Sequence, residues 1–152
     1  MDNIIIWDIE TPRKCFLASF YDPSCNEWKD FIIKEGRNDL SYMLRYMEDN
    51  IDKWFVGFNN LKFDGQVLQF IYQNSQKWFN LSGREIAKLI SDFGSMEIEN
   101  LNYGLFPTYR EQDFHFKQLD LGAIWHFFGE QKKTSLKQLE YEMRAENIEN
   151  LE

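Results

Sequence analysis

Two acidic side chains, Asp8 and Glu10, follow the first apolar run of the chain. Branched apolar residues over 4–6 are typical of a buried strand, and Pro12 ends the stretch. Because side chains two residues apart on a strand point to the same face, we expect the two carboxylates to lie side by side. Adjacent like charges at the end of a core strand are costly unless something positive lies between them. A divalent cation is the obvious candidate.

A third carboxylate, Asp64, falls in a helix predicted over 61–73. It precedes Val67 and Leu68 by three and four residues, so it lies on the apolar face of that helix and points toward the sheet. The short strand predicted over 54–58 returns this helix beside the first strand. We therefore expect three carboxylates to converge. Such hard oxygen ligands suit Mg²⁺ or Mn²⁺, and two ions about 4 Å apart can hold a phosphodiester for attack by water.

The apolar pattern also predicts the elements that must position these residues. In chain order it predicts strands over 4–11, 15–21, 28–33, 54–58 and 114–119, and helices over 40–51, 61–73, 82–94, 121–128 and from 134 or 135 onward. The first three strands form an antiparallel meander. Ser82 and Glu85 make a capping box, Gly94 is expected to stop that helix, and 97–112 reads as loop with a short hairpin.

Length and composition indicate one folded domain. The chain has 152 residues, of which 43% are hydrophobic and 17% aromatic, and this excludes a disordered protein. Cys15 and Cys25 lack CxxC spacing and a secretory context, so we expect reduced thiols. No signal peptide or membrane span is evident, which predicts a cytoplasmic protein.

The net charge of −8 argues against ordinary phosphate binding, which usually leaves a basic footprint. Enzymes that approach phosphates through metal ions are an exception, because they need clustered carboxylates and the ions supply the positive charge. Net charge therefore does not decide between a nucleic-acid enzyme and another class of protein.

Two motifs resemble those of a known family. Asp8-Ile9-Glu10-Thr11 resembles the first motif, DxE, and the segment NLKFDG over 60–65 resembles the second, in which an asparagine precedes FD by a few residues, of DnaQ-like 3'-5' exonucleases. The similarity is nearest to the proofreading domain of phage and family B DNA polymerases. It implies an α/β domain over 1–152 with the RNase H-like fold, a mixed sheet with helices on both faces. It also implies cleavage of single-stranded DNA ends during DNA replication, in a bacterial or phage-infected cell.

The resemblance further implies roles for single residues. The metal ligands that bind two Mg²⁺ or Mn²⁺ ions would be Asp8, Glu10 and Asp64. The residues that contact the terminal nucleotides of a single strand would be Thr11, Asn60, Lys62 and Phe63. Aromatic faces with basic neighbours are a general way of holding single strands, which agrees with Phe63 beside Lys62.

The third motif of the family, YxxxD or HxxxxD on a late helix, has no clear match. His115 and Asp120 have the second spacing, but they fall in a predicted strand. The segments that follow, 121–128 and 135–140, resemble those that precede the third motif in the family. The alternative is a chain that ends before its third motif, attached to or associated with a polymerase.

Other functions are also compatible with these residues. An RNase of the same fold would use the same carboxylates, because no reader of the 2'-hydroxyl is identifiable. A catalytically impaired module that binds nucleic acid or a partner protein would explain both the missing motif and the charge of −8. In the plainest interpretation, Asp8 and Glu10 are a solvated strand end, and Asp64 only complements its helix dipole.

Overall fold

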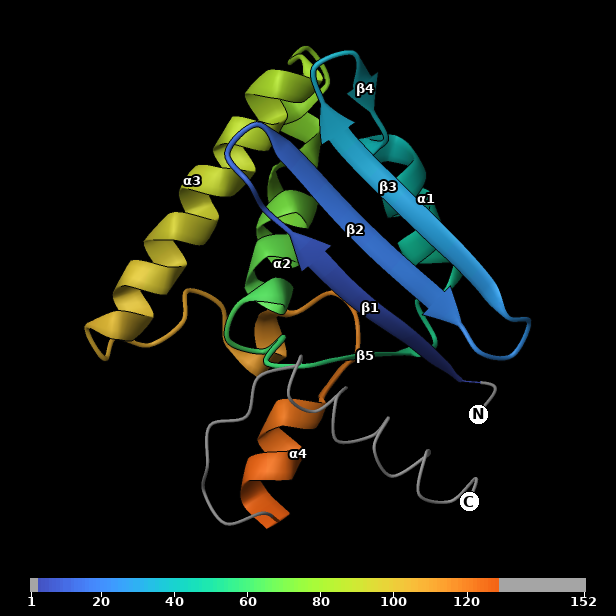
Figure 1. Ribbon diagram of the computed structural model, residues 1–152, viewed down its shortest axis with the longest axis vertical. Helices are drawn as coiled ribbons and strands as arrows, with labels where there is room; N and C mark the ends of the chain where they lie inside the picture. Colours follow the sequence, from blue (N-terminus) through green and yellow to red (C-terminus); the bar gives the residue numbers. More distant parts are fainter. Residues whose placement is uncertain (1–2, 129–152) are drawn as a thin grey trace, which may run out of the picture.

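The chain forms an α/β structure around one mixed sheet of six strands, in the order β4-β3-β2-β1-β5-β6 (Figure 1). In this computed structural model, residues 3–128 are described. The strands are β1 (Ile4–Glu10), β2 (Cys15–Asp22), β3 (Glu27–Lys34), β4 (Arg37–Asn38), β5 (Trp54–Gly57) and β6 (Gln118–Asp120). The helices are α1 (Leu40–Asp49), α2 (Asp64–Asn74), α3 (Gly83–Asn102) and α4 (Leu121–Phe128), with short 3₁₀ turns η1 (Ser75–Trp78) and η2 (Glu111–Asp113).

The predicted antiparallel meander is confirmed. β1 pairs with β2, placing Asp8 opposite Ser19, and β2 pairs with β3 over its whole length. The chain then crosses over through α1 and returns as β5, which lies parallel to β1 with Ile5 opposite Phe55. β6 extends the parallel part of the sheet on the far side of β5. The carboxyl ends of β1, β5 and β6 therefore lie at the same end of the sheet.

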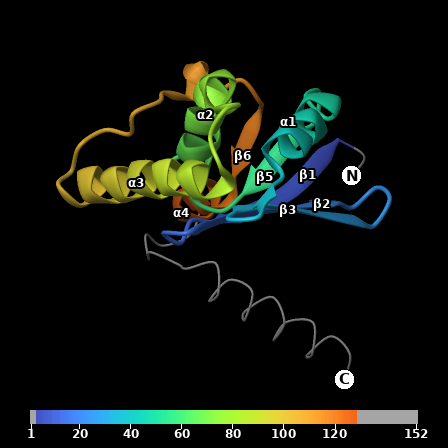
Figure 2. The same cartoon turned by 90° about the horizontal axis from the view of Figure 1, so that it is seen from above.

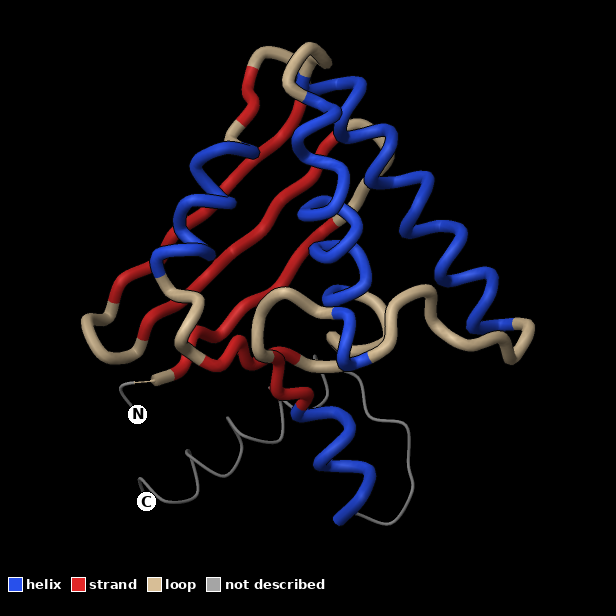
Figure 3. Tube along the Cα trace, turned by 180° about the vertical axis from the view of Figure 1, so that it is seen from behind, coloured by secondary structure: helices blue, strands red, loops and turns tan. Residues whose placement is uncertain are grey.

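One face of the sheet carries the core. Alternation along β1 buries Ile5, Trp7 and Ile9, and Phe16 and Phe20 continue the same layer on β2. α1, α2 and α3 all pack on this side (Figures 2 and 3). The expected arrangement with helices on both faces is not formed by these three helices. The helix predicted from 134 or 135 lies outside the described residues.

The capping box at the start of α3 is confirmed. Ser82 Oγ accepts from Glu85 N at 3.2 Å, and Glu85 Oε2 accepts from Ser82 N at 3.2 Å. The predicted stop at Gly94 is wrong. α3 continues to Asn102, and Gly94 serves a packing contact instead, since a Cβ there would lie 3.3 Å from the Phe63 ring. The loop and hairpin expected over 97–112 are accordingly replaced by the last turns of α3, a loop and η2.

The strand predicted over 114–119 is mostly irregular, and only Gln118–Asp120 pairs with β5. Side-chain contacts fix the preceding residues: His115 contacts Glu48 at 2.5 Å and stacks on Tyr72, while Phe116 is buried in the core. The prediction of α4 over 121–128 is confirmed. None of the helices over residues 3–128 is long and apolar enough to cross a membrane.

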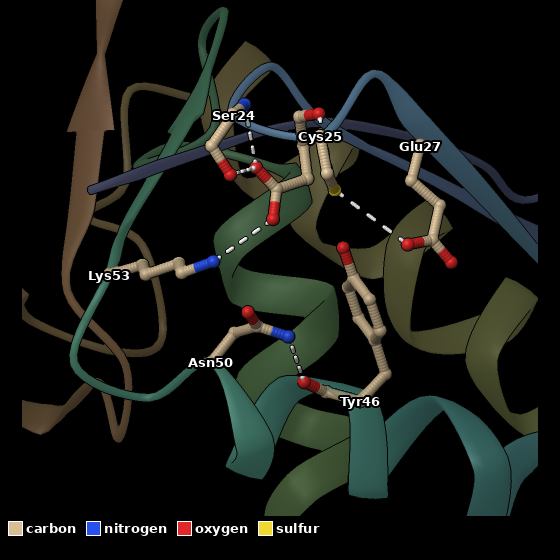
Figure 4. A network of polar contacts seen from close by, with 7 residues as sticks. Ser24, Cys25, Glu27, Tyr46, Asn50 and Lys53 are labelled. Carbon is tan, nitrogen blue, oxygen red and sulfur yellow. Dashed lines mark hydrogen bonds and ion pairs between the residues drawn. The ribbon is translucent and has the colours of Figure 1, made fainter. Parts of the chain in front are cut away.

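A polar network closes the opposite end of the sheet (Figure 4). Asp22, at the end of β2, accepts from Ser24 N at 2.9 Å and Ser24 Oγ at 2.6 Å, and it pairs with Lys53 Nζ at 3.0 Å. The Ser24 hydroxyl and the Lys53 ammonium lower the pKa of Asp22 to about 2. Since Lys53 immediately precedes β5, this network ties the meander to the parallel part of the sheet.

Replacing Asp22 with Asn should lower the free energy of unfolding at pH 7 by about 1 to 2 kcal/mol. The folded-state pKa lies below the unfolded value of 3.8, so the contribution is present above pH 4 and is lost as the pH falls toward 2. Urea denaturation at pH 7 and pH 2.5 measures the difference between wild type and variant. Asp30→Asn, an exposed change on β3, is the matched control. An equal loss at both pH values would contradict the assigned network.

Candidate metal and nucleic-acid site

Asp8 and Glu10 lie on the face of β1 that points away from the core. Both side chains are exposed, and they alternate with the buried Trp7 and Ile9. The sequence prediction that the two acids share one strand face is confirmed. Because they lie at the carboxyl end of β1, they are at the end of the sheet where the parallel strands stop.

Asp64 is the first residue of α2 and lies at the same end of the sheet. Its half-buried carboxyl group lies close enough to the Asp8 carboxyl group and the backbone of Ile9 for both to act on its protonation. Burial, the charge of Asp8 and the hydrogen bond to Asp8 raise the pKa of Asp64 to about 8. The more distant charge of Glu10 acts in the same direction. Asp64 therefore keeps its proton near neutral pH when no cation is bound.

The donor set of this pair is chemically suited to a hard cation. A divalent ion that bound between the two carboxyl groups would displace the proton of Asp64 into solvent and supply the positive charge that the two acids lack. Over residues 3–128, however, no three acidic, His or Cys side chains are grouped closely enough to hold a metal ion. Asp8 and Asp64 are in contact, while Glu10 is only near enough for its charge to be felt.

The loop before Asp64 is fixed by Asn60, whose side chain is fully buried. Asn60 Nδ2 donates to Gln118 Oε1 at 3.0 Å, and its carbonyl accepts from Gly65 N at 2.6 Å. The resemblance implied that Asn60 contacts a nucleotide. In this structure the side chain has no exposed surface and holds the loop before Asp64 in place. The nucleotide contact of Asn60 stays a prediction of the resemblance.

Thr11 and Phe63 both lie against α3 at Gly94. A methyl group added at Gly94 would lie 3.3 Å from the Phe63 ring and 3.5 Å from the Thr11 hydroxyl. Both side chains are half-buried, and Phe63 packs against the core. Gly94 therefore allows two of the predicted nucleotide-contacting residues to approach one another beside the carboxylates.

Lys62 is exposed and borders a surface cavity of about 600 Å³. Arg110 and the almost fully exposed Phe106 also line this cavity. A cation beside an exposed aromatic ring is a combination used to hold single-stranded nucleic acid, so the surroundings of Lys62 are compatible with its predicted role.

Asp120 belongs to the support of the site. Its Oδ1 accepts from Asn59 N at 2.8 Å, and its Oδ2 accepts from Leu61 N at 3.2 Å. Oδ1 also accepts from Gly122 N at 2.9 Å and Ala123 N at 3.2 Å, in the first turn of α4. His115 is engaged elsewhere, with Glu48. The pair with HxxxxD spacing is therefore not a formed ligand set, and Asp120 joins the loop before Asp64 to α4.

Sequence reasoning missed two buried polar side chains, Gln66 and Glu97, which have no exposed surface. Gln66 exchanges two hydrogen bonds with the backbone of Tyr109, at 2.7 and 2.8 Å, and donates to Leu61 O at 2.9 Å. Glu97 accepts from the backbone and hydroxyl of Thr108. Both lie within helices among apolar neighbours, and that interruption of the pattern was the available signal.

These assignments depend on the chain's own geometry. Comparisons with protein-family models, curated proteins and solved structures found no match to this chain. The structure therefore brings together Asp8 and Asp64, with Glu10 near them and Thr11 and Phe63 against α3.

Replacing Asp120 with Ala should lower the free energy of unfolding by roughly 3 kcal/mol, because four backbone N–H groups lose their acceptor. Chemical denaturation measures this change. Asp113→Ala removes an exposed cap of η2 and should cost about 1 kcal/mol or less. A stable Asp120→Ala protein that has lost only divalent-ion binding would identify Asp120 as a ligand instead.

The raised pKa of Asp64 makes metal-free stability depend on pH. Between the unfolded value of 3.8 and the folded value of about 8, the folded protein binds more protons, so stability should fall as pH rises through this range. Urea denaturation in EDTA at pH 5 and pH 8 measures the slope. Asp64→Asn should flatten it, whereas Asp49→Asn, an exposed change on α1, should leave it as in wild type. A slope in Asp64→Asn identical to that of the wild type would show that Asp64 does not carry the raised pKa.

Proposed function

We propose that the chain is a divalent-metal-dependent 3'-5' exonuclease that acts on single-stranded DNA ends, as the proofreading portion of a phage-type DNA polymerase. The observation that carries this proposal is the contact between Asp64 of α2 and Asp8 of β1. Two carboxyl groups held together at a sheet edge have a ready explanation if a cation joins them on binding substrate.

The topology supports the RNase H-like fold within this proposal. The sheet consists of an antiparallel meander, β3-β2-β1, followed by the parallel strands β5 and β6. Acidic residues at the carboxyl end of β1 and at the start of α2 lie where ligands commonly bind in open α/β sheets, outside the strand ends.

In the proposed reaction Asp8, Glu10 and Asp64 would hold two Mg²⁺ or Mn²⁺ ions. When bound, such ions activate a water and stabilise the leaving oxygen of the phosphodiester. Asp64, whose pKa is raised to about 8, must give up its proton before it can act as a ligand, so metal binding would be coupled to proton release. Glu10, exposed beside Asp8, is the residue free to turn toward the pair.

Phe63 and Lys62 would hold the end of the strand. Phe63 precedes Asp64 directly and is braced by Gly94, so its ring offers a fixed surface for the terminal base. Lys62 is exposed and can approach a phosphate. Thr11 lies near the same stretch of α3 and can donate its hydroxyl to the terminal nucleotide.

The test is digestion of a single-stranded oligonucleotide labelled at its 5' end, in Mn²⁺. The wild-type chain should produce a ladder of shortened products, and Asp8→Asn or Asp64→Asn should slow this by about a hundredfold or more. Asp49→Asn should digest at the wild-type rate. Equal rates in all four proteins would show that the nuclease is a contaminant and would overturn the proposal.

The second candidate is a binding module of the same fold without hydrolytic activity. It is favoured by the spacing of the acids, since no three of them are grouped as a formed metal site over residues 3–128. Calorimetric titration with Mn²⁺ separates the two, because the module gives no binding heat that depends on Asp8 and Asp64. Offering an RNA oligonucleotide in the same digestion distinguishes an RNase from a DNase.

A further inference from the structure

A second surface, the basic cavity, lies at the other end of α3 from the loop over 103–110. It has a volume of about 430 Å³ and is lined by Arg13, Lys14, Ser82, Arg84, Glu85 and Lys88. Two of these cations come from the turn between β1 and β2, and two come from the first turns of α3. Segments about seventy residues apart in the sequence thus place four cations around one hollow.

The positive charge of the basic cavity is largely uncompensated by the residues that the structure describes. Among its cations only Arg84 has an acidic partner, Glu35, at 3.9 Å, and both side chains are mostly exposed. The one acid in the lining, Glu85, is held by the capping box through its bond to Ser82 N. In a chain of net charge −8, this concentration of cations makes a local positive field that could bind a polyanion.

The two segments of the basic cavity are held by backbone contacts. A Cβ at Gly83 would lie 2.1 Å from Lys34 O and 2.8 Å from Arg37 O, so only glycine lets α3 start this close to β3 and β4. In the turn, Cys15 N donates to Pro12 O at 3.2 Å. The amino end of α3, which favours anions, therefore opens beside cations whose backbone is already in place.

The basic cavity lies a short distance along the chain from the candidate site. Arg13 follows Glu10 by three residues, a separation that a chain spans with at most about 11 Å. Lys88 precedes Gly94 by six residues, or about 9 Å along the helix axis, and Gly94 lies against Phe63 and Thr11. A strand whose end reaches Asp8 and Asp64 can therefore lay its next phosphates along α3.

We propose that the basic cavity binds the phosphate backbone of the single-stranded nucleic acid whose end reaches the carboxylates, an inference that rests on the proposed function. Exposed arginine and lysine side chains at four positions fit a row of phosphates, each of which a cation neutralises without reading sequence. The short distance to the carboxyl groups of Asp8 and Asp64 favours a nucleic acid over an acidic protein as the polyanion.

The experiment measures binding of a fluorescent single-stranded oligonucleotide to the full chain in EDTA, so that hydrolysis does not interfere. Anisotropy titrations over a range of salt give the slope of log affinity against log salt concentration. The double variant Arg13→Gln, Lys88→Gln removes two phosphate contacts, and this slope should fall by about 1.4. Arg45→Gln, Lys77→Gln changes the net charge equally at exposed positions outside the cavity and should keep the wild-type slope.

An unchanged slope in Arg13→Gln, Lys88→Gln would overturn the proposal. As competitors, unlabelled oligonucleotide and polyglutamate of the same length are compared. If polyglutamate displaces the labelled oligonucleotide at the same concentration as unlabelled oligonucleotide does, the proposal is overturned in favour of an acidic protein partner. Digestion in Mn²⁺ is measured on the same preparations. If the salt slope depends on the cavity residues but no digestion occurs, phosphate binding by the cavity is supported and the exonuclease proposal is rejected. If digestion occurs and the slope is the same in the variant, the exonuclease proposal is supported and phosphate binding by the cavity is rejected.

Discussion

The contact between the carboxyl groups of Asp8 and Asp64 is the constraint on which the rest of the site depends. Two acids in contact oppose each other unless they share a proton or a cation, so the chain must hold them together against that cost. The holding force comes from the loop between β5 and α2. Asp120 accepts from two backbone N–H groups of this loop, and Asn60 bonds to Gln118 beneath it.

The loop between β5 and α2 allows its backbone to lie close to its neighbours. Asn59 adopts a positive φ of 57°, which asparagine tolerates better than most residues. A Cβ at Gly65 would lie 2.6 Å from the backbone oxygen of Asn60 as well as 2.2 Å from Gln118 Oε1, so glycine is required where α2 begins beside β6. Because β6 also carries Asp120, the last strand in the sheet order supports the residue that begins α2. The acids on β1 depend in this way on residues more than a hundred positions later.

Local patterns predicted the parts of the structure that local forces determine. The acidic pair of β1, the capping box of α3 and the bounds of α4 follow from residue spacing and were predictable. Gly94 was not, because its role is set by Phe63 more than thirty residues away and not by the helix it occupies. For the same reason local patterns did not indicate that the amide of Asn60 is buried against Gln118, a residue 58 positions later.

The distribution of charge also limits what a sequence total can say. A net charge of −8 predicts repulsion between this chain and any polyanion, and at long range that holds. Salt screens such fields over about 8 Å at physiological ionic strength, so contacts within a groove depend on the nearest charges. Around the basic cavity these are arginine and lysine, while at Asp8 and Asp64 they are carboxyl groups. One short segment, from β1 into its turn, therefore carries both kinds of local charge, and the net charge of the chain describes neither.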